Sequence, residues 1–91
     1  MSTSAQRVGE LLQAYAAMSE PDSGPGVTRL SYTPLERDAH DFFRSQLESL
    51  GLTVTVDPVG NTIAELPGSD PDLPAIGTGS HLDSVPNAGA F

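Results

Sequence analysis

The chain contains no cysteine and no lysine, and both absences narrow what it can do. Without cysteine, neither a disulfide nor a thiolate metal site can form. Four arginines are its only strong cations against twelve acidic residues, which gives a formal net charge of −8. Because this excess of negative charge repels nucleic acid and anionic membrane surfaces, we expect the chain to bind neither.

Long apolar runs and aromatic residues are also scarce. No stretch approaches the roughly 20 apolar residues of a membrane-spanning helix, and no apolar segment preceded by basic residues marks a secretory signal. Hydrophobic residues make up 37% of the 91 residues and aromatic residues 5%, which is enough for a modest core in one domain at most. We therefore expect a cytoplasmic, soluble protein.

The N-terminal part of the chain has the pattern of a helix followed by a loop. Apolar residues at helical spacing predict a helix over residues 4–19, with Ser4 as its N-cap. The two prolines and two glycines of residues 20–26 then end the helix. This loop lacks the glycine and lysine pattern of a phosphate-binding loop.

A second helix is marked by the clearest local signal in the chain. Thr33 can cap the first turn, Pro34 occupies a position where its missing N–H costs nothing, and Glu36 completes a capping box. The helix is expected to run to about Leu50, with Gly51 as its C-terminal stop.

Three strands are predicted after the second helix. Residues 52–56 alternate apolar and polar side chains, residues 57–61 form a turn, and residues 62–66 return as the second strand of a hairpin. Residues 73–76 are a short apolar run typical of a buried strand. Two helices followed by about three strands predict an α/β fold.

The chemistry of the chain is concentrated in the stretch Gly79-Ser80-His81-Leu82-Asp83-Ser84-Val85-Pro86-Asn87. His81 and Asp83 would follow a buried strand, where α/β sheets place their ligands, and their spacing in a strand puts both side chains on one face. Neutral imidazole is the commonest metal ligand, and a nearby carboxylate can fix its tautomer and ring orientation. The alternative is a structural, hydrogen-bonded histidine. His40 lies off the apolar face of its helix and is expected to be an exposed histidine rather than a ligand or a base.

This stretch, followed by Gly89 and Phe91, resembles the first metal-binding motif of the M20-type binuclear zinc amidohydrolases. It is most similar to the branch of N-carbamoyl-amino-acid hydrolases, ureidopropionases and allantoate amidohydrolases. A second match lies far away in sequence, since Val27-Thr28-Arg29-Leu30 resembles a Gly-Val-Thr-Arg-Leu segment of the same branch. The turn from Asp57 to Asn61 also resembles one in the family, although turn-forming side chains that bond to the local backbone are the preferred explanation of both residues.

The resemblance implies a role for each residue of the motif. His81 would bind one metal ion, and Asp83 would be a catalytic-site carboxylate that supports the metal site without binding the metal. The family carries two Zn²⁺ ions per site, with Mn²⁺, Co²⁺ or Ni²⁺ as possible replacements, and bound metal lowers the pKa of water and polarises a carbonyl. The family's bridging aspartate is expected directly after the step Gly89-Ala90-Phe91, where the given sequence ends.

The resemblance also implies a larger parent protein. The remaining ligands, the glutamate base and the lid and dimerisation domain of the family are not in residues 1–91, so we expect an incomplete N-terminal segment of the catalytic domain. The parent fold would be a zinc-peptidase-like three-layer α/β/α sandwich in a homodimer. The parent would cleave a C–N bond in a small linear amide, either an N-carbamoyl amino acid or a ureide, and the segment alone would be inactive.

Two other classes remain open at the level of the sequence. A related M20 metallopeptidase or deacylase would differ in substrate-binding parts that residues 1–91 do not contain. A non-catalytic gene remnant or a small acidic partner-binding domain would show no dependence on zinc. The sequences of residues 27–30 and 84–87 favour the amidohydrolase branch.

Overall fold

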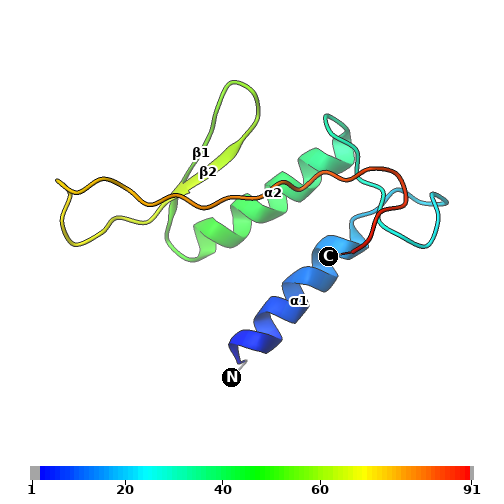
Figure 1. Ribbon diagram of the computed structural model, residues 1–91, viewed down its shortest axis with the longest axis horizontal. Helices are drawn as coiled ribbons and strands as arrows, with labels where there is room; N and C mark the ends of the chain where they lie inside the picture. The colour runs from blue at the N-terminus through cyan, green and yellow to red at the C-terminus, as the bar shows by residue number, and fades with distance from the viewer. Residues whose placement is uncertain (1–2, 91) are drawn as a thin grey trace. The chain divides into compact units, whose positions relative to one another are not determined.

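The computed structural model of the chain describes residues 3–90 and contains two helices followed by two strands. In chain order these are α1 (Ser4–Ala17), α2 (Pro34–Ser49), β1 (Thr53–Val56) and β2 (Thr62–Glu65), as Figure 1 shows. The predicted mixed α/β class is confirmed. Neither α1 nor α2, the helices of the described residues, has the length and apolar character needed to cross a membrane.

The chain divides into two compact units. One comprises Met1–Ala39 together with Leu82–Phe91, so it is built from two pieces of chain that are far apart in sequence. The other is the continuous stretch His40–His81. Buried residues are few among those described: the consecutive residues Val27, Thr28 and Arg29, and Ala39 of α2, all of them in the first unit.

Helix α1 begins at Ser4, as predicted, but its N-cap is a different residue from the one predicted. Thr3, and not Ser4, is the N-cap, because the Thr3 hydroxyl accepts a hydrogen bond from Gln6 N–H while the Gln6 side chain accepts one from Thr3 N–H. This reciprocal pair is a capping box in which glutamine replaces the usual glutamate. The helix ends at Ala17, two residues before the predicted end at position 19.

Both ends of α2 agree with the local sequence signals. Thr33 Oγ1 accepts a hydrogen bond from Glu36 N–H at 3.2 Å, as predicted, but the Glu36 carboxylate accepts from Tyr32 N–H instead of from Thr33 N–H. At the other end Gly51 has a φ of +82°, and the N–H groups of Gly51 and Leu52 donate to the carbonyls of Glu48 and Leu47. This pairing ends the helix as a Schellman motif, which favours glycine at that position.

Strands β1 and β2 form the predicted hairpin. They pair antiparallel with Thr53 opposite Glu65 and Val56 opposite Thr62. The turn between them is held by the Asp57 carboxylate, which accepts hydrogen bonds from the N–H groups of Val59 and Asn61 and from the Asn61 side-chain amide. The turn-forming interpretation of Asp57 and Asn61 is therefore confirmed.

These hydrogen bonds make the hairpin sensitive to acid. The Asn61 side chain, followed by its backbone N–H, lowers the pKa of Asp57 below its ordinary value. A folded pKa below the unfolded one means that the carboxylate stabilises the hairpin above the unfolded pKa, about 3.9, and that this contribution is lost as the pH falls through the folded pKa. We expect Asp57→Ala to remove this part of the acid sensitivity, measured as the dependence on pH of the β1–β2 amide protection in hydrogen exchange. An unchanged pH profile in Asp57→Ala would contradict this role.

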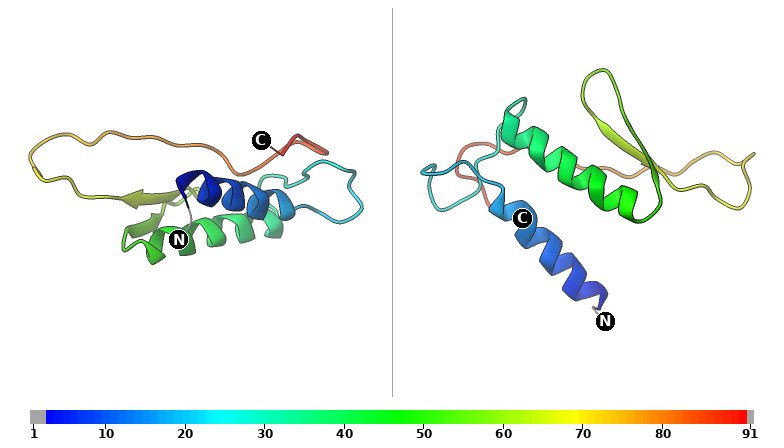
Figure 2. Two further views of the ribbon diagram at one scale, coloured as in Figure 1. Left: turned by 90° about the horizontal axis from the view of Figure 1, so that it is seen from below. Right: turned by 180° about the vertical axis from the view of Figure 1, so that it is seen from behind.

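The third predicted strand is wrong. Residues 66–85 contain no strand, and Figures 1 and 2 show this part of the chain as an extended segment without regular structure. Ile76 is 100% exposed and Leu73 is 68% exposed, so the apolar run is not buried. A strand needs a neighbour to accept its backbone hydrogen bonds, and Pro74 has no N–H to donate. Nothing among residues 3–90 pairs with residues 73–76.

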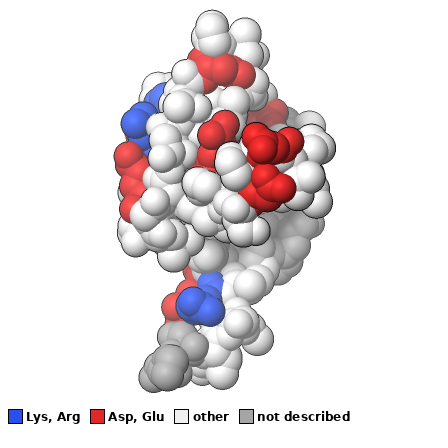
Figure 3. All heavy atoms as spheres, turned by 90° about the vertical axis from the view of Figure 1, so that its left-hand side faces the viewer, with Lys and Arg blue, Asp and Glu red and all other residues white. Residues whose placement is uncertain are grey.

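The surface carries the charge that the composition predicts. Figure 3 shows one face on which acidic side chains predominate. The ion pair between Arg44 and Glu48, at 3.5 Å, joins two exposed side chains one turn apart on α2. Such pairs contribute little to stability in water.

Candidate functional site

Residues 27–30 lie side by side with residues 82–88, the part of the motif that belongs to the first unit. Val27 and Ala88 form an antiparallel backbone pair, in which each N–H donates to the other residue's carbonyl at 2.8 Å. These residues are 61 positions apart in sequence. In Figure 1 the segment that contains Val27 meets the red C-terminal segment at this point. The fold therefore uses residues 26–31 as the support for residues 82–88.

Ser84 extends this support through both its backbone and its hydroxyl. The N–H of Ser84 donates to the Arg29 carbonyl at 2.7 Å, and the N–H of Arg29 donates to Ser84 Oγ at 2.9 Å. The same oxygen lies 3.1 Å from the Val27 carbonyl, which can accept its proton. A serine here bonds to the backbone of two residues on the opposite segment, so Ser84 has a structural role beside the motif.

Asn87 closes the pairing at its other end. Its side-chain oxygen accepts a hydrogen bond from Gly26 N–H at 2.7 Å, and its own N–H donates to Thr28 Oγ1 at 2.8 Å. Asn87 has a φ of +51°, a conformation that asparagine tolerates better than most residues. The Pro86-Asn87 turn is thus tied to residues 26–28 from both its side chain and its backbone.

The Arg29 side chain joins the motif to the first helix. Only 7% of Arg29 is exposed, and its Nε donates to the Leu82 carbonyl at 2.6 Å. Its Nη1 lies 2.7 Å from both the Tyr15 and the Met18 carbonyls, at the C-terminal end of α1. A cation at this end of a helix also interacts favourably with the helix dipole. Leu82 lies between His81 and Asp83, so Arg29 fixes the backbone in the middle of the His-x-Asp sequence.

Burial and charge act in opposite directions on this arginine. Burial lowers the pKa of Arg29, and the nearby Tyr15, Asp83 and Glu36 raise it in part. Burial likewise raises the pKa of Tyr15, while the positive charge of Arg29 opposes that rise. Arginine starts from so high a value that it stays protonated, and its guanidinium can therefore supply all these hydrogen bonds.

Asp83 is held by a direct hydrogen bond. The Ser31 hydroxyl donates to the Asp83 carboxylate, and both residues belong to the first unit. Asp83 is half-buried, and its negative charge lies close enough to Arg29 to affect the pKa of that side chain. The carboxylate is consequently held by a neutral hydrogen-bond donor, Ser31, in the electrostatic field of a buried cation, Arg29.

His81 is exposed and belongs to the second unit, whereas Asp83 belongs to the first. No strand contains either residue, so the prediction that a strand places both on one face is wrong. The reason is the missing strand at residues 73–76, which was expected to carry the motif. The step Gly89-Ala90-Phe91 ends at a residue that lies outside the described part of the chain.

His40 is half-buried, not exposed as predicted. Its Nδ1 lies 2.8 Å from Thr62 Oγ1, at the start of β2. The contact joins α2 to the hairpin within the second unit, and it supports the structural interpretation of this histidine over a role as ligand or base.

A complete metal site is not present among residues 3–90. No three histidine, aspartate or glutamate side chains of these residues come together in a way that could hold a metal ion. Catalytic zinc is ordinarily bound by about three protein ligands. His81 and Asp83 therefore do not fit a metal ion by themselves, and any metal bound by this motif needs ligands from elsewhere.

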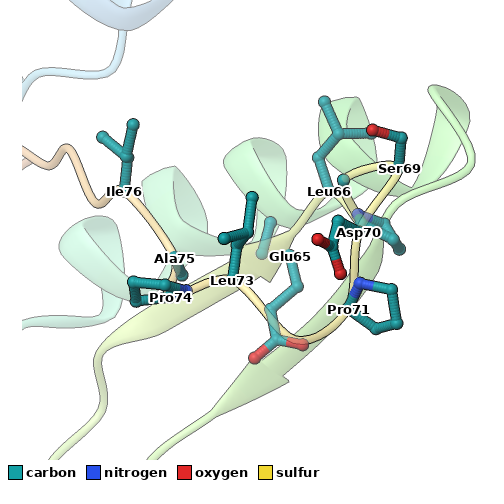
Figure 4. Close-up of a pocket in the computed structure, with 12 residues that line it drawn as sticks. Glu65, Leu66, Ser69, Asp70, Pro71, Leu73, Pro74, Ala75 and Ile76 are labelled. Carbon is teal, nitrogen blue, oxygen red and sulfur yellow. The ribbon is translucent and has the colours of Figure 1, made fainter.

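A hollow in the second unit is unrelated to the motif. It has a volume of about 690 Å³ and lies between the end of β2 and the segment that follows it (Figure 4). Leu66, Leu73 and Ile76 line it together with the carboxylates of Glu65 and Asp70. None of the residues that the sequence singles out for chemistry takes part, and the lining comes from one local stretch of chain.

Sequence reasoning missed the residues that organise the motif. Arg29 belongs to a segment that resembles the family, but no local pattern indicates that its side chain reaches Leu82. The only signal in the sequence for a structural role of Arg29 is its position among apolar neighbours, in a chain that has four arginines and no lysine. Ser31 carries no distinguishing signal, because serines are common in exposed loops. Ser84 is part of the motif, but nothing in the sequence indicates that its hydroxyl bonds to residues 27–29.

Comparison with known proteins places these observations in a family context. The chain is 48% identical over 68 residues to an N-carbamoyl-L-amino-acid amidohydrolase of Paenarthrobacter aurescens, a match that covers 75% of the chain and 16% of the relative. It is 42% identical over 86 residues to the corresponding enzyme of Geobacillus stearothermophilus, covering 94% of the chain and 21% of the relative. An allantoate amidohydrolase of Bacillus subtilis is 38% identical over 82 residues, covering 90% and 19%.

These matches define the class first. The chain is related in sequence to amidohydrolases. The match to the Geobacillus stearothermophilus enzyme covers 94% of the chain, so the matched part includes both residues 27–30 and His81. Within that class, the chain is a homologue of the carbamoylase branch, whose members include N-carbamoyl-L-amino-acid and allantoate amidohydrolases. The chain spans only about a fifth of the length of these relatives.

No protein-family model matches the chain, and no solved structure gives a significant match.

Proposed function

We propose that the protein carrying this chain is a zinc-dependent amidohydrolase that cleaves a C–N bond in a linear amide, of the N-carbamoyl amino acid or ureide type. The observation that carries the proposal is that 94% of the chain matches part of an N-carbamoyl-L-amino acid amidohydrolase, a match that includes both segments of the first unit. The hydrogen bonds between those segments support the proposal. Two segments that hold each other in place in the fold are expected to resemble the same family.

In this proposal His81 is a ligand of one metal ion and Asp83 is a supporting carboxylate. Because His81 is exposed, its imidazole is accessible to a metal ion that is also bound by ligands from other parts of a larger protein. The hydrogen bond from Ser31 to Asp83 supports its role, since a carboxylate that orients a ligand has to be held in place itself. Mn²⁺, Co²⁺ or Ni²⁺ are alternative metals for the same donor types.

The remaining parts of the enzyme belong to the parent protein. We propose that residues 1–91 are an N-terminal segment of a three-layer α/β/α catalytic domain, in a cytoplasmic homodimer that also has a lid and dimerisation domain. The unpaired apolar run at residues 73–76 would then become a strand beside neighbours from the rest of that domain. The 91-residue chain alone is expected to be inactive, because its described residues do not hold a metal.

The direct test measures ammonia release by the complete protein from N-carbamoyl-L-amino acids and from allantoate, with and without added Zn²⁺. The 91-residue chain is assayed in parallel. Metal-dependent turnover by the complete protein only is the expected result. Turnover of short peptides or N-acyl amino acids in place of these substrates would identify a metallopeptidase or deacylase instead. Turnover by the 91-residue chain would contradict its expected inactivity.

Removal of the proposed ligand is expected to affect both metal content and activity. His81→Ala in the complete protein is predicted to lower turnover by more than the roughly 10- to 100-fold that follows loss of a residue supporting a ligand. Metal content, measured by mass spectrometry of the purified protein, is expected to fall with it. His40→Ala is the matched control, because His40 contacts Thr62 and should leave metal content unchanged. Equal metal content in wild type and His81→Ala would show that His81 is not a ligand.

A further inference from the structure

Tyr32 has an unusual backbone conformation for its size. Its φ is +62°, in the left-handed region, which is rare for residues other than glycine, asparagine and aspartate and is strained for a bulky side chain. Burial does not explain the conformation, since 90% of Tyr32 is exposed and its ring therefore packs in no core. The chain thus holds a large aromatic side chain in water by means of a strained turn.

The surrounding hydrogen bonds maintain this turn. The N–H of Tyr32 donates to the Glu36 carboxylate at 3.1 Å, and the Thr33 hydroxyl donates to the Leu30 carbonyl at 2.7 Å. Strained residues persist only where their surroundings hold them, and they are concentrated at functional sites. The turn from Leu30 to Thr33 therefore presents the Tyr32 ring from a fixed backbone.

The position of the turn connects it to the motif. Ser31, directly before Tyr32, donates its hydroxyl to the Asp83 carboxylate, and all these residues belong to the first unit. One side of the turn is thus anchored on the acid of the His-x-Asp sequence, and the next residue extends an exposed aromatic ring. Tyr32 is thus the residue directly after the one that holds the Asp83 carboxylate.

We infer that Tyr32 is a substrate-contacting residue that favours N-carbamoyl amino acids with apolar side chains, an inference that rests on the proposed function. A tyrosine ring offers a large apolar face at little cost in conformational entropy, and its hydroxyl tolerates a partly wet site. The ring, and not the hydroxyl, is expected to make the contact with the apolar part of the substrate.

The test compares two substrates in the complete enzyme. Tyr32→Ala is expected to lower kcat/KM for N-carbamoyl-L-leucine about tenfold more than for N-carbamoylglycine, at the low end of the range for an apolar contact in a binding pocket. Tyr32→Phe retains the ring and should stay within about twofold of wild type for both substrates. Equal losses for the two substrates, or no loss for either, in a folded Tyr32→Ala protein would overturn the inference.

Controls separate the contact from the strain. Tyr32→Gly removes the ring and relieves the backbone, so it should show the same substrate discrimination as Tyr32→Ala with a higher melting temperature. Asp22 also has a positive φ, +59°, in the same unit but has no bond to Asp83, and Asp22→Gly should change neither kcat/KM. If wild type hydrolyses neither of these substrates nor allantoate, the proposed function fails and this inference with it. If wild type hydrolyses allantoate but neither N-carbamoyl substrate, only the inference fails. If wild type is active and Tyr32→Ala discriminates as wild type does, the inference alone fails.

Discussion

Arg29→Met is expected to destabilise the first unit by about 3 kcal/mol, a large fraction of the stability of an ordinary small domain. Methionine keeps much of the volume of the arginine stem but cannot donate a hydrogen bond. The carbonyls of Tyr15, Met18 and Leu82 would lose their donor together. Each partly buried acceptor left without a partner costs about 1 kcal/mol or more.

The measurement is urea unfolding followed by circular dichroism, with Arg44→Met as the matched control. Arg44 makes one exposed pair with Glu48, so its loss should cost no more than about 0.5 kcal/mol. Arg29→Lys keeps the charge but not the forked arrangement of donors, and it should fall between the two. A free energy of unfolding for Arg29→Met equal to that of Arg44→Met would show that Arg29 does not join the segments.

Gly26→Ala is expected to cost about 3 kcal/mol for a steric reason. A Cβ atom at this position would lie 2.3 Å from the Ala88 carbonyl oxygen and 2.8 Å from Asn87 Oδ1, far inside normal contact distances. The backbone at residues 87–88 would have to move, and the paired bonds between Val27 and Ala88 would break with it. Forcing extra atoms into such a contact typically costs about 1–3 kcal/mol before the lost hydrogen bonds are considered.

Gly9→Ala provides a control with the opposite sign. Gly9 lies inside α1, and a Cβ atom there would meet nothing within 4 Å. Alanine is favoured over glycine in a helix by up to about 1 kcal/mol, so this variant should be more stable than wild type. The two variants are compared by thermal unfolding under identical conditions. Destabilisation by Gly9→Ala, or none by Gly26→Ala, would contradict the described packing.

Local signals in the sequence predict the elements whose cause is local. Thr33, Pro34 and Gly51 mark the ends of α2, and the Asp57 turn marks the hairpin, because these residues bond to atoms a few positions away. The predicted strand at residues 73–76 failed, since a strand depends on a neighbour that the local pattern does not specify. Apolar character alone did not bury Ile76.

The candidate site shows the same difference between features with a local cause and features that depend on distant residues. The motif that contains His81 and Asp83 is visible in the sequence, and the comparisons support the family it resembles. The contacts that hold this part of the motif are not visible, because Ser31 lies 52 positions from Asp83 and Arg29 lies 53 positions from Leu82. Hydrogen bonds of that kind follow from the folded path of the chain, which spacing along the sequence does not encode.

The discontinuous first unit has a consequence for the order in which the chain folds. The bonds between its two pieces join residues 52 to 61 positions apart, so they cannot form on a ribosome until residues 82–88 have been made. The continuous stretch His40–His81 has no such requirement and can form its hairpin earlier. Closing a long loop costs entropy and slows folding. The segment with Val27 and Arg29 thus leaves the ribosome early and has to wait, with its backbone donors and acceptors in water, for the partner that secures it.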